Sequence, residues 1–121
     1  MKISIISYAF YGLQRAGVMD LFGYLESVRY RYGLDAADVW NGTLASTDEG
    51  YLQKVKQGLQ ERELTLACLA VDGAHIRDPD PDVREGHYRN ALDHLRAAEF
   101  LGARTVRIDM GGQGDEMAPE Q

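Results

Sequence analysis

Residues 64–71 form a short, almost unbroken apolar run that constrains the fold more than any other segment of the chain. The run stops abruptly at polar residues that begin with Asp72. A continuous apolar run of this length is typical of a strand covered on both faces, which is common in parallel sheets. The run therefore predicts a buried strand of a parallel sheet.

The residues after this run predict a helix and a further strand. Two prolines within residues 78–81 disfavour a helix there, whereas Asp82 is a suitable N-cap with Glu85 at capping-box spacing. Gly102 has the position of a glycine that ends a helix, and residues 105–109 read as the next strand. The expected inner face of the helix comprises Tyr88, Ala91, Leu92, Leu95 and Ala98. The whole segment predicts a βαβ unit, whose crossover is nearly always right-handed.

Two further strand and helix pairs are expected before this unit. Residues 3–7 are rich in isoleucine and predict the first strand. A helix is expected from an Asp20 start to Gly33, followed by a second strand and its exit at residues 36–42. A residue within 46–48 then caps another helix, whose predicted inner face comprises Leu52, Val55 and Leu59.

Four parallel strands starting about 30 to 35 residues apart fit two architectures. One is the first four β/α units of an eight-stranded TIM (β/α)8 barrel, and the alternative is a small open parallel α/β sheet. Residues 116–121 look like the first turn of a fourth helix, which favours a barrel truncated at that point. We therefore expect residues 1–121 to be a single partial domain, the N-terminal half of a TIM barrel.

Charge and composition narrow the classes of partner. The formal net charge of −6 disfavours binding to a nucleic-acid phosphate backbone. No segment approaches the ~20 apolar residues of a membrane span, and the N-terminal apolar segment is too short for a signal peptide. We expect a cytoplasmic protein without a nucleic-acid or membrane partner. The single cysteine, Cys68, provides neither a disulfide framework nor a thiolate metal site.

Candidate site residues follow the predicted strands, because ligands of α/β proteins bind at the carboxyl ends of strands. His75 follows the third strand and is suited to acid–base chemistry, to a substrate hydroxyl, or to a structural hydrogen bond. Arg107 and Asp109 share a strand face, where they would hold an anionic or polyhydroxylated ligand or form a structural ion pair.

Aromatic and amide side chains add a second group of candidates. Tyr8 ends the first strand, while Trp40 and Asn41 end the second, and such residues either bind a sugar ring or belong to the core. Asp72 either orients His75 or, as we expect, anchors a turn through its side chain. His87 and His94 are expected on the surface. Histidines and carboxylates form no dense ligand cluster in the sequence, so we predict no metal ligand within this chain.

Two segments carry a resemblance to a known family. Residues 66–76 read Leu-Ala-Cys-Leu-Ala-Val-Asp-Gly-Ala-His-Ile, and residues 97–109 read Ala-Ala-Glu-Phe-Leu-Gly-Ala-Arg-Thr-Val-Arg-Ile-Asp. Together with Arg-Asn-Ala-Leu at 89–92, they resemble the sugar phosphate isomerase/epimerase family. That family has the xylose-isomerase-like TIM-barrel fold, shared with endonuclease IV-type enzymes. The likeness covers the whole chain as the first half of the family.

The resemblance implies the N-terminal half of a metal-dependent sugar or sugar-phosphate isomerase or epimerase. The family binds a divalent metal (Mn, Mg, Co or Zn) through residues of later strands, so this half is expected to be inactive alone. The resemblance also implies a catalytic role for His75 and substrate binding by Tyr8, Trp40, Arg107 and Asp109.

Two other functions stay open. One is a non-catalytic half-barrel that pairs with itself or with a partner through exposed sheet edges. The other is an endonuclease IV-like metal-dependent nuclease, which the net charge of −6 disfavours. The first would make the protein a homo-oligomer or the subunit of a complex with a partner, and the second would require a basic surface.

Overall fold

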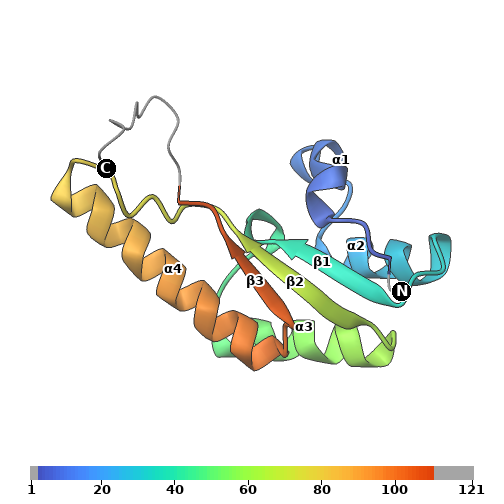
Figure 1. Ribbon diagram of the computed structural model, residues 1–121. Coiled ribbons are helices and arrows are strands. Elements are labelled where there is room, and N and C mark those ends of the chain that lie inside the picture. The colour runs from blue at the N-terminus through green and yellow to red at the C-terminus, as the bar shows by residue number, and fades with distance from the viewer. Residues whose placement is uncertain (1–2, 111–121) are drawn as a thin grey trace.

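The computed structural model describes residues 3–110 (Figure 1). These residues form a small α/β domain with a three-stranded parallel sheet of order β1-β2-β3 and four α-helices. The strands are β1 (Ala36–Trp40), β2 (Thr65–Val71) and β3 (Thr105–Ile108). The α-helices are α1 (Tyr11–Arg15), α2 (Leu21–Glu26), α3 (Glu49–Glu61) and α4 (Pro81–Leu101). Shorter segments are the 3₁₀ helices η1 (Ser7–Phe10) and η3 (Asn41–Thr43), and the π-helix η2 (Ser27–Arg31).

The predicted unit of strand, helix and strand is confirmed. β2 pairs in parallel with β1 on one side and with β3 on the other. α4 connects β2 to β3 and ends at Gly102, whose φ of 75° is the left-handed conformation that glycine adopts without a Cβ clash. The described part of the chain is thus an open parallel sheet, the second of the two architectures expected from the sequence.

The start of α4 differs from the prediction. Asp80, rather than Asp82, is the N-cap, and its carboxylate accepts the N–H of Asp82 at 2.9 Å. Pro81 is the first helical residue, a position that suits proline because the N–H it lacks would have no partner inside the helix. Pro81 therefore starts the helix, and the N-cap lies two residues before the predicted one.

The inner face of α4 was also predicted only in part. Ala91 and Ala98 are buried as expected, but Tyr88 and Leu95 are exposed. The other buried positions are His94, Ala97 and Leu101. His94 was expected on the surface, yet its Nδ1 lies 2.8 Å from the carbonyl oxygen of Asn90, a local contact that satisfies a buried imidazole.

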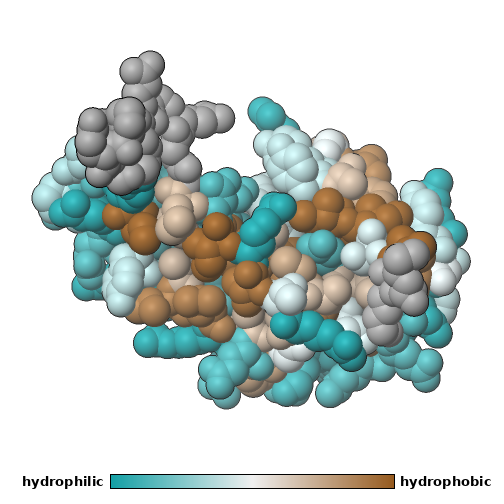
Figure 2. Space-filling model, viewed as in Figure 1, coloured by the Kyte–Doolittle hydropathy of each residue, from teal (hydrophilic) through white to brown (hydrophobic). Residues whose placement is uncertain are grey.

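β3 forms one edge of the sheet, and its residues alternate between two environments. Val106 and Ile108 pack against the core, whereas Thr105 and Arg107 are exposed. On the side of the molecule seen in Figure 1, Figure 2 shows hydrophobic residues gathered in a band across the middle of the surface. An edge strand beside apolar surface is a feature that favours association.

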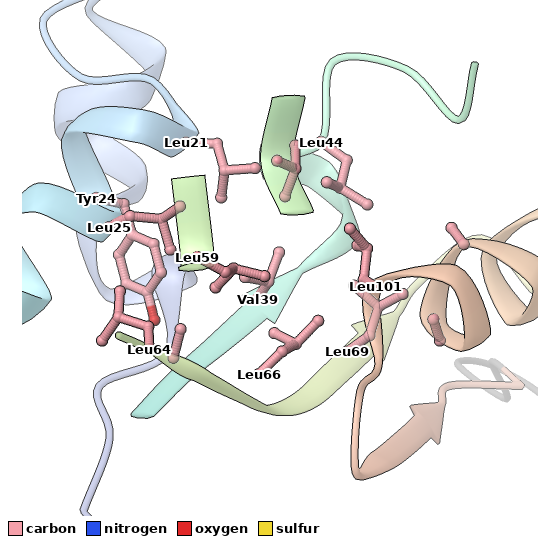
Figure 3. Close-up of a cluster of buried hydrophobic side chains, with 14 of the residues drawn as sticks. Leu21, Tyr24, Leu25, Val39, Leu44, Leu59, Leu64, Leu66, Leu69 and Leu101 are labelled. Atoms are coloured by element: carbon pink, nitrogen blue, oxygen red, sulfur yellow. The ribbon is translucent and has the colours of Figure 1, made fainter. Parts of the chain in front are cut away.

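The core lies between the sheet and the helices, and Figure 3 shows its leucines pointing toward one another. Leu52, Val55 and Leu59 form the buried face of α3, as predicted. They pack in one cluster with Val39 of β1 and Leu69 of β2. Full burial of each such side chain contributes about 1.5–3 kcal/mol, so this cluster supplies most of the driving force for folding.

The predicted strand at residues 3–7 is wrong. A single parallel bridge joins Ile6 to Asp38, and the chain then enters η1 at Ser7. The fully buried phenol of Tyr24 explains the difference: its oxygen accepts the N–H of Asp38 at 2.9 Å, and its O–H faces the carbonyl oxygens of Ile5 and Asp38. Backbone groups of β1 that a neighbouring strand would use are thus bonded to a side chain. Burial raises the pKa of Tyr24, which keeps its O–H as a donor.

Some expectations fall outside the described residues. The predicted turn of helix at residues 116–121 is one of them. Within residues 3–110, no helix combines the length and the apolar character needed to cross a bilayer.

Replacing Tyr24 by phenylalanine is expected to lower the free energy of unfolding by about 1–3 kcal/mol, because the buried N–H of Asp38 loses its acceptor. Urea denaturation followed by circular dichroism measures the change. Tyr30→Phe is the matched control, since the side chain of Tyr30 is exposed. Equal stability of the Tyr24 and Tyr30 variants would contradict the role assigned to the Tyr24 hydroxyl.

Candidate functional site

An open pocket of about 600 Å³ lies where β1 and β2 end and α4 begins. β1 contributes its last residue and the two that follow it, β2 contributes the two residues after its end, and α4 contributes one face of its first turns. Carboxyl ends of parallel strands are the usual place for ligands in α/β proteins. The lining residues are Trp40, Asn41, Gly42, Asp72, Gly73, Asp82, Val83, Gly86, His87 and Asn90.

The indole of Trp40 is held in one orientation at the wall of this pocket. Its N–H donates to Asp72 Oδ2 at 2.6 Å, a short bond of the charge-assisted kind. The ring lies against the backbone of Gly42, where an added Cβ would be 2.2 Å from a ring carbon. Tyr8 and Tyr11 meet the indole edge to face, with ring centroids 4.9 and 5.9 Å away. The pocket therefore has a fixed aromatic wall with a carboxylate beside it.

Two asparagine side chains hold the turn after β2. Asn41 Nδ2 donates to the carbonyl oxygen of Asp72 at 2.9 Å, and Asn41 Oδ1 accepts the N–H of Asp72 at 2.9 Å. Asn90 of α4 donates to the carbonyl oxygens of Asp72 and Gly73 at 3.1 and 3.0 Å. Gly73 has a φ of 77°, which a residue with Cβ rarely adopts. The backbone that carries the Asp72 carboxylate is thus fixed from both sides.

A closed set of hydrogen bonds supports Trp40 from the N-terminal segment. The fully buried Ser7 Oγ accepts the N–H of Trp40 at 2.9 Å and lies 2.8 Å from Thr43 Oγ1. Thr43 Oγ1 donates to Gln14 Oε1 at 3.3 Å, and Gln14 Nε2 donates to the carbonyl oxygen of Ser7 at 2.8 Å. Because each side chain is engaged on two sides, the ring of contacts ties η1, α1 and η3 to the end of β1.

His75 and His87 form a parallel pair beside the pocket. Their rings stack with centroids 4.7 Å apart and planes 7° apart, and His87 Nδ1 accepts the N–H of His75 at 3.0 Å. A ring nitrogen that accepts a hydrogen bond carries no proton, so the proton of neutral His87 is on Nε2. His87 is half-buried and lines the pocket, so its surface position has contacts that the sequence did not predict.

The structure brings several predicted site residues together. Trp40 and Asn41 line the pocket, Tyr8 contacts Trp40, and His75 contacts a lining residue. Asp72 was expected to anchor a turn through its side chain, but its carboxylate bonds the indole. No sequence signal marked the lining residues of α4, because only the fold brings its first turns beside the strand ends.

Arg107 and Asp109 are not among the residues that line the pocket. Arg107 is exposed and pairs with Ala70, which in turn pairs with Trp40, so these backbones lie about 10 Å apart across the sheet. The Asp109 N–H donates to the carbonyl oxygen of Val71 at 2.9 Å. Whether this pair contacts a ligand stays a prediction.

Asp38 lies on β1 and interacts with Arg107. Among the described residues, its Oδ1 is a buried side-chain oxygen without a hydrogen-bond partner. Burial raises the pKa of Asp38, and the charge of Arg107 partly opposes this effect. The sheet therefore carries a carboxylate whose ionised form is poorly solvated.

Stability is expected to fall as the pH rises through the raised pKa of Asp38. Below the unfolded value of about 3.9 both states bind the proton, whereas above it the folded state holds the proton more tightly until the raised pKa is passed. Asp38→Asn removes this ionisation, so the variant is expected to be more stable than the parent at neutral pH and to show a flatter profile. Denaturant melts at several pH values measure this, with Glu99→Gln as an exposed control; a parent-like slope in Asp38→Asn would contradict the assignment.

The chemistry that the pocket offers is stacking, hydrogen bonding and proton exchange. Within residues 3–110, no three His, Cys, Asp or Glu side chains are grouped to hold a metal ion. An aromatic wall beside a carboxylate and an imidazole suits a ligand that has both apolar and hydroxyl faces.

No protein-family model matches the chain, and no curated protein is significantly similar to it.

Proposed function

We propose that this chain is the sugar-binding N-terminal half of a TIM barrel of the sugar isomerase and epimerase type. The observation that carries the proposal is the Trp40–Asp72 pair at the carboxyl ends of neighbouring parallel strands. A sugar ring has a C–H face that packs on an aromatic ring and hydroxyl groups that bond carboxylates. The resemblance of residues 66–76 and 97–109 to that family supports the same reading.

Four residues in or beside the pocket have distinct parts in this proposal. Trp40 packs against the C–H face of the sugar, and the Asp72 carboxylate accepts a hydrogen bond from a sugar hydroxyl through the lone pairs that the indole N–H does not use. The Nε2–H of His87 donates to a sugar oxygen, since Nδ1 is engaged by His75. His75 is exposed and keeps its proposed acid–base role next to that donor.

Isomerase chemistry itself is assigned to the complete barrel. In such reactions a metal polarises a carbonyl and a hydroxyl of the open-chain sugar, and a carboxylate removes the adjacent proton. The residues described here do not form a metal site, so no step of the proposal passes through a metal held by them. In a closed barrel the sheet face that carries Arg107 would point toward the axis, where Arg107 and Asp109 would position sugar oxygens.

The chain is expected to bind a sugar such as D-fructose without converting it. Binding is measured by the fluorescence of Trp40, the single tryptophan of the chain, and turnover by product analysis with manganese present. Asp72→Asn keeps an acceptor for the indole but loses the charge, and about tenfold weaker binding is expected from a loss near 1.4 kcal/mol.

Two glycine variants control for this experiment. Gly42→Ala displaces the Trp40 ring without changing a polar group, so it is expected to weaken binding. Gly50→Ala adds the same methyl group where nothing lies within 4 Å and should bind like the parent. Absence of D-fructose binding in the parent would contradict the proposed function, and turnover by this chain alone would contradict the division of roles.

A second candidate function is a half-barrel that self-associates without catalysis. β3 is an edge strand in the order β1-β2-β3, and hydrophobic residues gather on the surface of that side (Figure 2). Unpaired strand edges and apolar patches are templates for association. Pairing of two copies through this edge would bury the apolar surface that a complete barrel hides by closure.

This second function predicts a dimer or larger species in sedimentation at micromolar concentration. A lysine just after β3 is expected to weaken association, because charges on strand edges oppose pairing. Met110→Lys tests this, and Val18→Lys is the control, since both side chains are exposed. A monomer with a sharp cooperative unfolding transition would contradict self-association.

A further inference from the structure

The pocket presents negative and neutral groups to its ligand. Asp72 and Asp82 are carboxylates, and no lysine or arginine is among the lining residues in the described part of the chain. His87 adds no positive charge in the form seen here, because its Nδ1 accepts the N–H of His75. Residues 111–121 contain no lysine or arginine in their sequence either.

The N-terminus of α4 would ordinarily favour an anion beside this pocket, since free N–H groups and the helix dipole attract negative charge. In this chain, aspartate carboxylates already lie at the start of α4. The Asp80 carboxylate accepts the N–H of Asp82, and Asp82 adds a second negative charge in the first turn. One N–H that could bond a phosphate group at this helix start is therefore already bonded to a carboxylate, and Asp82 places a second negative charge beside it.

Asp82 belongs to the face of α4 that borders the pocket. It shares helical spacing with Gly86 and Asn90, which also line the pocket. Its own side chain is exposed, while its backbone N–H is the group that bonds the cap. The Asp82 carboxylate is therefore accessible to a ligand, because the helix cap uses the backbone N–H of Asp82 and not its side chain.

We propose that this pocket binds an uncharged sugar or polyol and discriminates against the phosphorylated form. The proposal rests on the sugar-binding function proposed above and narrows its substrate class. Repulsion between a phosphate dianion and the two carboxylates opposes binding, and no lining cation offsets it. The aromatic wall of Trp40 and the hydrogen-bonding groups around it do not depend on a charged ligand.

The test compares D-fructose with D-fructose 6-phosphate as ligands of the 121-residue chain by isothermal titration calorimetry at low salt. The uncharged sugar is expected to bind at least ~10-fold more tightly, with the difference shrinking as salt screens the carboxylates. Asp82→Asn removes one charge and should reduce the ratio of the two affinities. Asp82→Lys should reduce it further.

The matched control is Glu99→Lys, which makes the same change in net charge at an exposed position near the other end of α4. Its affinity ratio is expected to equal that of the parent. Tighter binding of the phosphate ester by the parent would overturn this inference and leave the sugar-binding function standing. An unchanged ratio in both Asp82 variants would also overturn it, and failure of both sugars to bind would overturn the inference together with the proposed function.

Discussion

The parallel pairing of β2 on both sides is the constraint on which the rest of the structure depends. Parallel pairing brings the carboxyl ends of all strands to one edge, so the residues after each strand become neighbours. The register sets Trp40 beside Ala70, and Asp72 follows two residues later at a position where its carboxylate reaches the indole. A shift of one residue would turn Asp72 to the other face and separate the pair.

The parts of the fold that the sequence predicted are those decided by local pattern. The apolar run before Asp72, the buried face of α3 and the glycine at 102 each depend on residues within one element. The segment 3–7 was not predictable in this way, because its fate depends on Tyr24, a residue of another element that bonds the edge of β1. Pro81 illustrates a smaller limit, since the same residue is compatible with a turn and with a first helical position.

The candidate site was predicted where strand ends alone specify it. Trp40 and Asn41 could be placed near the pocket because they end a predicted strand, and His75 because it follows one; a ligand-binding role for the three stays a prediction. The contributions of His87 and Asn90 arise from the angle at which α4 leaves the loop after β2, and helical periodicity does not encode that angle. Asp72 was predicted as a turn residue, and its bond to the indole was missed because that bond joins residues of two strand ends.

The contact between Trp40 and Gly42 has a consequence for how this sequence can vary. The ring occupies the space that any Cβ at position 42 would need, so a large aromatic residue at 40 requires glycine at 42. A smaller residue at 40 would release that requirement and leave position 42 free to change. Positions 40 and 42 are therefore expected to covary among related sequences rather than to change independently.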